Sequence, residues 1–353
     1  MSKPKLLELD IVRALAIVAV LLIHGTATPR VELPLGSRSH TLYFGINNLS
    51  YFPVQAFVLL SGLVLFYSYF DNWSVRRIPG FYRKRLQFIL IPYLVWSCFY
   101  YLYDQWLNPA VNVHFSLQEF ARLLPWAEAG YHLYFMALIM QFYALFPLLV
   151  TLVKLCRPLA RYLWLFGIAV QAAVSIYSQY ANAPIPHGDR LFITYFALFC
   201  IGGSLGMYYE RFIGWLNRNV YWVTAATASV GFAFLLLSLQ AQYGTQFKWW
   251  EFELLFTLYP VLVTISFVWI GRHWLSNAPR LAGALSSLGA ASFGVYFIHP
   301  ALLGYYTMHA AVAPGGWEYH AALWGGIVLI VIVPWVIVNQ LKRVKASWIL
   351  FGK

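Results

Sequence analysis

Charged residues are scarce in this chain of 353 residues: Asp, Glu, Lys and Arg make up 10%, whereas 61% of the residues are hydrophobic. A soluble domain usually carries about 25% charged residues. No polar stretch is long enough to form a separate soluble domain, so we expect a single domain over residues 1–353. The composition excludes an ordinary soluble protein and indicates a protein embedded in a membrane.

Cysteine is almost absent. Cys98, Cys156 and Cys200 lie in or beside apolar runs, show no metal-ligand spacing and, being odd in number, give no disulfide framework. We interpret them as packing residues and expect no metal site. The net charge of +12 would suit nucleic acid, but the Lys and Arg residues lie in short loops between apolar segments. This pattern is typical of membrane topology, so no nucleic-acid partner is expected.

Long apolar runs are abundant instead, and about ten reach the roughly 20 residues that a membrane helix needs. The first is expected to be an uncleaved helix and not a signal peptide, because Asp10 and Arg13 interrupt its start and many spans follow. We predict an all-α polytopic membrane protein with helices over approximately 9–28, 45–69, 86–106, 132–153, 160–180, 191–209, 220–240, 251–271, 286–309 and 321–341.

The basic residues are distributed unevenly between alternate loops. With the N-terminus in the cytoplasm, 18 of the 24 Lys and Arg residues lie in cytoplasmic segments, and only five lie on the other face: Arg30, Arg38, Arg122, Arg190 and Lys248. Lys and Arg accumulate in cytoplasmic loops. The bias predicts an even number of spans with both termini in the cytoplasm, as in a multi-pass protein of a bacterial plasma membrane.

The first apolar segment, LDIVRALAIVAVLLIHG, contains Asp10, Arg13 and His24. In a helix Arg13 and His24 share one face about 16 Å apart, and Asp10 lies one turn before Arg13, close enough to pair with it. The structural interpretation is that Arg13 reaches lipid phosphate and His24 is an interface histidine. The functional interpretation rests on the rule that ionisable residues inside a membrane mark sites. A neutral imidazole can act as a general base, and Arg suits the phosphates of a long cofactor.

A basic cytoplasmic segment follows the second span. Its residues Arg76, Arg83 and Arg85 serve topology alone or bind a polyanion such as a nucleotide diphosphate, and Phe81-Tyr82 is a candidate stacking surface for the base. Ser61, which precedes Gly62 in the second span, is a weak candidate because small residues commonly serve helix packing in membranes.

Two further segments carry candidates. Tyr131, His132 and Tyr134 begin the fourth span from the outer side and form, with Tyr143, either an aromatic belt or a rim that binds sugar. His299 lies in the ninth span directly before Pro300, where a structural role would be to bond a carbonyl group that the proline frees.

Taken in order, these motifs resemble the acyltransferase-3 family of integral membrane acyltransferases, from about residue 6 to 310. The segment YHLYF…FYALFPLL is most similar to the branch that includes membrane proteins of biofilm polysaccharide operons. One position departs from the family pattern: a second Arg often follows the residue matching Arg85, and here Phe88 stands in its place. The matching residues are Asp10, Arg13 and His24, the Ser-Gly segment 57–65, the basic loop and Pro-Tyr at 81–93, the His-Leu-aromatic motif at 132–134, and Tyr296 with His299.

The resemblance implies a membrane O-acyltransferase. Acyl-CoA, most simply acetyl-CoA, would enter from the cytoplasm, and His24 would be the general base for a hydroxyl of a polysaccharide or glycolipid. The chain ends soon after the tenth span, so transfer would be direct or completed by a separate glycan-synthesis protein. The resemblance assigns the donor phosphates to Arg13, Arg76, Arg83 and Arg85, and assigns acceptor binding or structural support to Asp10, Ser61, Tyr131, His132, Tyr134 and His299.

Two other functions stay open. An exporter or flippase for a glycan or a lipid-linked sugar would use the intramembrane charges to line its translocation path. A purely structural membrane partner of a glycan synthase would give no role to Arg13 and His24. An acyltransferase differs from both because it must bind acyl-CoA.

Overall fold

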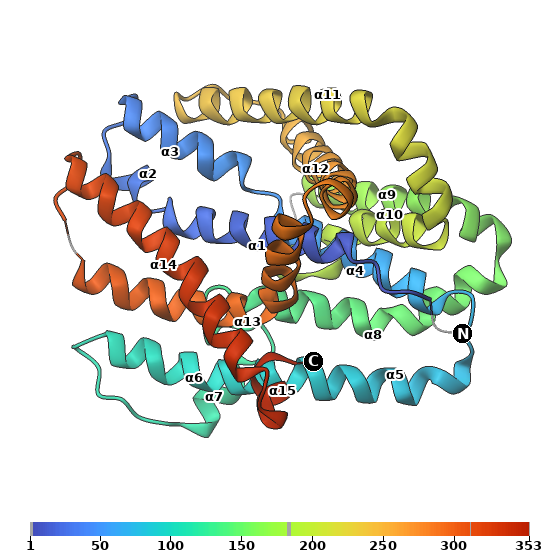
Figure 1. Cartoon of the computed structure of the whole chain (residues 1–353), viewed down its shortest axis with the longest axis horizontal. Helices are drawn as coiled ribbons and strands as arrows, with labels where there is room; N and C mark the ends of the chain where they lie inside the picture. Colours follow the sequence, from blue (N-terminus) through green and yellow to red (C-terminus); the bar gives the residue numbers. More distant parts are fainter. Residues whose placement is uncertain (1–2, 182–184, 311, 353) are drawn as a thin grey trace. The chain divides into compact units, whose positions relative to one another are not determined.

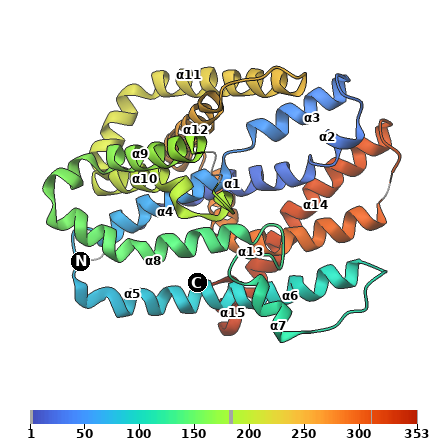
Figure 2. The ribbon, with the colours of Figure 1, turned by 180° about the vertical axis from the view of Figure 1, so that it is seen from behind.

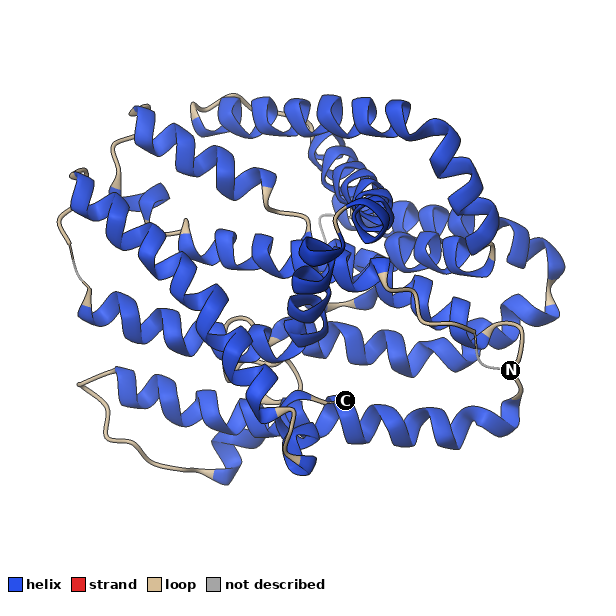
Figure 3. Cartoon of the chain, in the orientation of Figure 1, coloured by secondary structure: helices blue, strands red, loops and turns tan. Residues whose placement is uncertain are grey.

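The computed structural model describes residues 3–181, 185–310 and 312–352, and within these ranges the regular elements are helices, with no strand (Figure 3). Nine helical segments of the described part are long and apolar enough to cross a membrane, and a shorter apolar segment, Phe192–Met207, stands at the predicted sixth span. The prediction of an all-α polytopic membrane protein is confirmed. The cytoplasmic location of the termini and the single domain stay predictions; Lys353 and part of the expected connector at 180–190 lie outside the described residues.

The helices group into two compact units. Unit 1 comprises Met1–Lys3, Val58–Tyr209 and Asn339–Lys353, and unit 2 comprises Pro4–Phe57 and Glu210–Val338. The elements in chain order are α1 (Glu8–Gly25), α2 (Pro29–Glu32), α3 (Arg38–Leu49), α4 (Pro53–Tyr69), η1 (Val75–Arg77), α5 (Ile78–Arg85), the π-helix η2 (Leu86–Leu90), α6 (Ile91–Leu107), α7 (Leu117–Leu123), α8 (Tyr134–Leu155), α9 (Arg157–Tyr180), η3 (Gly188–Arg190), η4 (Phe192–Tyr195), α10 (Phe196–Met207), α11 (Tyr209–Gln242), α12 (Trp249–Asn277), α13 (Pro279–His309), α14 (Trp317–Leu341), η5 (Lys345–Ser347) and α15 (Trp348–Phe351).

The second predicted span, 45–69, is divided in the structure. Helix α3 ends at Leu49 and α4 begins at Pro53. A proline has no N–H for a helical hydrogen bond and disfavours helical geometry at the residue before it, so a new helix starts at Pro53. The third predicted span, 86–106, extends further back than expected, because η2 and α5 continue the helical path to Ile78.

Within unit 2, α1 packs against α12, α13 and α3 (Figure 1). Two glycines allow the backbones to approach closely. A Cβ atom at Gly289 of α13 would overlap the carbonyl oxygen of Asp10, and one at Gly271 of α12 would lie 2.9 Å from the carbonyl oxygen of Glu8. The α12 and α13 backbones therefore press directly on the first turn of α1, the turn that carries its acidic residues.

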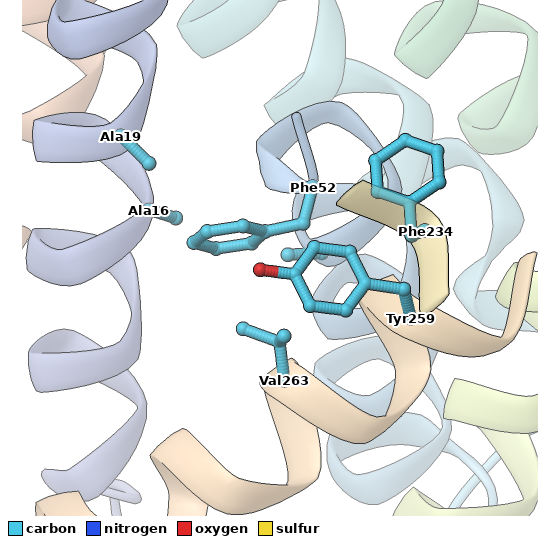
Figure 4. Packing of buried hydrophobic residues seen from close by; sticks show 7 residues of the cluster. Ala16, Ala19, Phe52, Phe234, Tyr259 and Val263 are labelled. Carbon is cyan, nitrogen blue, oxygen red and sulfur yellow. The ribbon is translucent and has the colours of Figure 1, made fainter. Parts of the chain in front are cut away.

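An apolar cluster covers the middle of α1 (Figure 4). Ala16 and Ala19 of α1 face Phe52, and Phe52 meets the Tyr259 ring edge-to-face at a centroid distance of 6.4 Å. The Tyr259 hydroxyl donates to the carbonyl oxygen of Leu49 at 2.7 Å. Leu49 is the last residue of α3, where carbonyl groups lack helical partners, so Tyr259 stabilises the break before α4.

Within unit 1, α10 packs against α4 and also against α9 (Figure 2). Cβ atoms at Gly62 of α4 and at Gly202 and Gly206 of α10 would overlap carbonyl oxygens of the facing helix. Small residues at such contacts let membrane helices approach closely enough for backbone packing. Gly62 is therefore a packing residue.

Candidate functional site

The rings of His24 and His299 lie against each other in unit 2, with centroids 5.3 Å apart and planes inclined by 35°. His24 is on the last turn of α1, and His299 is fully buried in α13. His299 Nδ1 lies 3.0 Å from the carbonyl oxygen of Val295, which accepts a hydrogen bond from it. In a neutral imidazole this leaves Nε2 as an acceptor. Two histidines 275 positions apart in the sequence thus form one pair.

The hydrogen bond of His299 differs in one detail from the sequence interpretation. Pro300 lacks the N–H that would bond to the carbonyl of Tyr296. The ring nitrogen of His299 bonds instead to the carbonyl of Val295, one residue earlier. This bond fixes the orientation of the ring and identifies Nε2 as its unprotonated nitrogen when the imidazole is neutral.

The other end of α1 is held by ion pairs. The predicted pairing is present: Arg13 Nη1 lies 2.7 Å from Asp10 Oδ1. Lys5 also contacts the same carboxylate, with its Nζ 2.5 Å from Oδ2. The Asp10 side chain is 4% exposed, so a carboxylate in this position needs cations to offset its desolvation. Lys5 lies before the helix, and its partner could not be read from helical spacing.

A second acidic residue at this end was not singled out in the sequence. Glu8 is 5% exposed, and its Oε1 accepts a hydrogen bond at 2.8 Å from Nη1 of Arg272 on α12. The available signal was the presence of an acid in the first turn of a membrane span, because such a residue needs a cationic partner. In the sequence, Arg272 is one of the 18 basic residues of the predicted cytoplasmic segments, and nothing there links it to Glu8.

An amide network holds α1 near His24. Asn47 of α3 is buried; its amide donates to the carbonyl of Ile23 at 2.8 Å and to the Thr26 hydroxyl at 2.9 Å. Its oxygen accepts from Nη1 of Arg30 at 2.7 Å. The two residues contacted by the amide flank His24, so Asn47 positions the turn that carries this histidine. Nothing in the sequence alone indicated Asn47, because its partners lie in other segments: in α1, in the turn after it and in α2.

The predicted basic residues of unit 1 have three different environments. Arg76, on η1, is exposed. Arg83 is exposed at an open, mostly apolar groove of about 580 Å³, whose other lining residues are Pro79, Tyr82, Leu86, Gln87, Leu90 and Ile91. Arg85 is half-buried, and its guanidinium lies 4.7 Å from the ring centroids of both Phe81 and Tyr143.

Arg85 differs from Arg13 in its counter-charge. No carboxylate pairs with Arg85 among the described residues, and its buried Nε has no hydrogen-bond partner in this part of the chain. Two aromatic rings hold the cation by their electron-rich faces without neutralising it. Arg85 is therefore the basic residue of this segment best prepared to receive an anion.

The expected stacking surface at Phe81-Tyr82 is present only in part, because Tyr82 lines the groove beside Arg83 and Phe81 does not. Phe81 is buried, and its ring packs against Tyr69, Trp73 and Phe146 at centroid distances of 5.3 to 6.1 Å. The Tyr82 hydroxyl donates to the carbonyl of Ala144. The prediction that Phe81 stacks on a base is wrong because the aromatic cluster of unit 1 takes up its ring.

The candidates at the start of α8 form a separate group in unit 1. His132 is buried with its ring 4.5 Å from that of Tyr100 and 5.4 Å from that of Tyr131. Tyr131 is exposed and Tyr134 half-buried. Tyr143 lies apart from them, against Arg85. Of the residues predicted to form a sugar-binding rim, only Tyr131, His132 and Tyr134 lie close enough in the chain to form one.

The predicted residues thus fall into two sets. Asp10, Arg13, His24 and His299 belong to unit 2, on α1 and α13. The remaining predicted residues belong to unit 1: Ser61, half-buried on α4 beside Gly62, and Arg76, Arg83, Arg85, Tyr131, His132 and Tyr134.

Comparison with known proteins gives consistent results. A family model described as an acyltransferase domain matches residues 6–339. A Staphylococcus aureus (strain MRSA252) protein named as a probable poly-beta-1,6-N-acetyl-D-glucosamine export protein is 24% identical over 315 residues, covering 85% of this chain and 83% of that protein. Its namesake from Staphylococcus epidermidis is 23% identical over 312 residues, covering 86% of this chain and 82% of that protein. No solved structure matches significantly. The chain, a multi-pass bacterial membrane protein, therefore belongs to the acyltransferase-3 family.

Proposed function

We propose that the protein transfers an acyl group, in the simplest case acetyl, from cytoplasmic acyl-CoA to a hydroxyl of an extracytoplasmic polysaccharide or glycolipid. Family membership supports acyl transfer as the class of reaction. The observation that carries the proposal is the contact between His24 and His299 inside an apolar helical unit. An imidazole pair with one ring oriented by a backbone carbonyl is suited to moving a proton.

In the proposed reaction His24 takes the proton of the acceptor hydroxyl while that oxygen attacks the thioester carbonyl carbon. The carbon–sulfur bond then breaks, and the departing thiolate takes the proton back from the imidazolium. Each turnover leaves His24 neutral, so no further reactant is needed. The His299 ring, oriented by the carbonyl of Val295, lies against the His24 ring and holds it in position.

The donor phosphates are assigned to arginines. Arg13 lies eleven residues before His24 on α1, which corresponds to about 16 Å along the helix, a length that suits the pantetheine arm. Its pairing with Asp10 orients the guanidinium, whose remaining edge can bind a phosphate oxygen. Arg85, in unit 1, is assigned to the same donor by the family resemblance, and no carboxylate neutralises it in the described part of the chain.

The test is transfer by the purified protein in vesicles, with labelled acetyl-CoA outside and a β-1,6-linked N-acetylglucosamine oligomer inside. Wild type should label the oligomer, and His24→Ala should abolish labelling while CoA still binds. Full labelling by a folded His24→Ala protein would refute the role of His24.

Export of a polysaccharide is the second candidate, because the relatives are named as probable exporters. Vesicles separate the two functions. An exporter moves the unmodified oligomer across the bilayer without acyl-CoA, whereas a transferase leaves the oligomer in place and adds mass to it. Transport without acylation would favour the exporter.

A further inference from the structure

A polar pocket lies in unit 2 at the charged end of α1. It has a volume of about 380 Å³ and is lined by residues of α1, α11 and α12: Glu8, Asn217, Trp269, Arg272, His273, Leu275, Ser276 and Asn277. Ligand sites begin at roughly 300 Å³. Three helices supply its walls, so this is a built concavity and not the outer face of one helix. The polar lining and the size make this pocket a candidate ligand site.

The pocket has a cation with an unused edge. Arg272 binds Glu8 through Nη1 at 2.8 Å, and its side chain is 41% exposed. Glu8 orients the guanidinium, while the other nitrogens remain able to donate to a phosphate. Lys5, before α1, and Arg13, on α1, share the single carboxylate of Asp10. Three cations therefore face two carboxylates, which leaves a net positive charge.

The pocket also has groups that suit a nucleobase. The rings of Trp269 and His273 stack with centroids 5.0 Å apart and an angle of 14° between planes. A base can stack on an outer face of such a pair. Asn217, Ser276 and Asn277 also line the pocket. The Asn277 amide nitrogen donates to the carbonyl of His273 at 2.9 Å and the Ser276 hydroxyl to that of Arg272 at 3.5 Å, so their oxygens are the groups that can accept from the edge of a base.

We infer that this pocket binds the nucleotide end of the acyl donor, with the 3′-phosphate on Arg272 and the adenine on the Trp269–His273 pair. The inference rests on the proposed function. It is consistent with the order along α1: Glu8 precedes Arg13 by about 7.5 Å and His24 by about 24 Å at 1.5 Å per residue. The nucleotide, the diphosphate and the thioester would follow each other in this order.

The experiment measures binding of adenosine 3′,5′-bisphosphate, CoA and 4′-phosphopantetheine to the full chain in lipid nanodiscs. Arg272→Gln should weaken bisphosphate and CoA binding about tenfold or more, as loss of a charge-assisted bond predicts, and leave phosphopantetheine binding unchanged. The matched control is Arg280→Gln, which removes an exposed cation that does not line the pocket.

A second variant tests the pocket without touching the ion pair. Ser276→Trp fills the space from an exposed position and should have the same selective effect as Arg272→Gln. Unchanged bisphosphate binding in Ser276→Trp would overturn the inference, as would displacement of a bound phospholipid with no bisphosphate binding in the wild type. Failure of the proposed function is separate: it appears as undiminished acyl transfer by His24→Ala, whatever the bisphosphate binds.

Discussion

The two ends of α1 contain ionisable groups of different kinds. At its start, Glu8 and Asp10 are buried carboxylates, and each is paired with a cation from another part of unit 2 or from its own turn. At its end, the ionisable groups are two imidazoles in ring contact, beside an amide network centred on Asn47. Paired full charges fix a helix, whereas imidazoles can be neutral at working pH and exchange a proton. In the proposed function, the start of α1 is the anchoring and binding end and its last turn is the chemical end.

The largest effect is expected at the chemical end. His24→Gln keeps a polar side chain of similar size but cannot accept the hydroxyl proton. Loss of a general base lowers rates by roughly 10² to 10⁴-fold. Initial rates of acyl transfer should fall by this factor with CoA binding unchanged. The control is His309→Gln at the exposed end of α13, which should retain the wild-type rate.

At the anchoring end the effect should be on stability. Asp10→Asn leaves Lys5 and Arg13 without a carboxylate, and breaking a buried pair costs about 3 kcal/mol. Thermal unfolding in detergent should show a clearly lower midpoint. The same change at Asp71, which pairs with Lys3 at a more exposed site, should cost less than about 1 kcal/mol. Equal midpoints for the two variants would contradict the distinction between the ends.

Arg85 can be compared with Arg13: Arg13 is paired with the carboxylate of Asp10, whereas Arg85 has no carboxylate partner among the described residues. Arg85→Gln should raise the KM for acyl-CoA about tenfold, as expected for one charge-assisted contact, with a smaller change in kcat. Arg77→Gln, an exposed change on η1, is the control within the same basic segment. A KM equal to that of the control would remove Arg85 from the donor site.

Asn47 tests how precisely the chemical end must be held. Asn47→Asp keeps the acceptor for Arg30 but loses the donors to Ile23 and Thr26. We expect kcat to fall several-fold with KM nearly constant, and stability to fall by about 1–3 kcal/mol. Asn47→Gln, which restores an amide, should recover part of kcat. An equal loss in kcat and in donor affinity would instead indicate general unfolding.

The smallest effect concerns an ion pair outside the membrane helices. The backbone carbonyl of Asn112 raises the pKa of His114, and the hydrogen bond and charge of Glu119 act in the same direction. A raised folded pKa stabilises the loop below the unfolded value near 6.5, and this contribution is lost as pH rises through the folded value. Protection factors of the loop amides, which are corrected for intrinsic base-catalysed exchange, should therefore fall slightly between pH 6 and 8, and His114→Gln should remove this dependence.

The sequence predicted what depends on hydropathy and on local spacing. It placed the spans, because apolar length decides them, and it paired Asp10 with Arg13, because they are one turn apart. It missed Glu8–Arg272 and Asn47, whose partners come from other helices, and it misplaced Phe81, whose ring is taken by packing. The contact between His24 and His299 depends on how α1 and α13 pack, which spacing along one helix does not reveal.

The most direct test of the account is mass spectrometry of the cell-surface glycan, with its amount measured in parallel, from cells carrying wild type or His24→Gln. We predict that the variant leaves the amount of glycan unchanged and removes its acyl mass. A glycan that keeps its acyl groups but falls in surface amount would contradict acyl transfer by His24 and would support export.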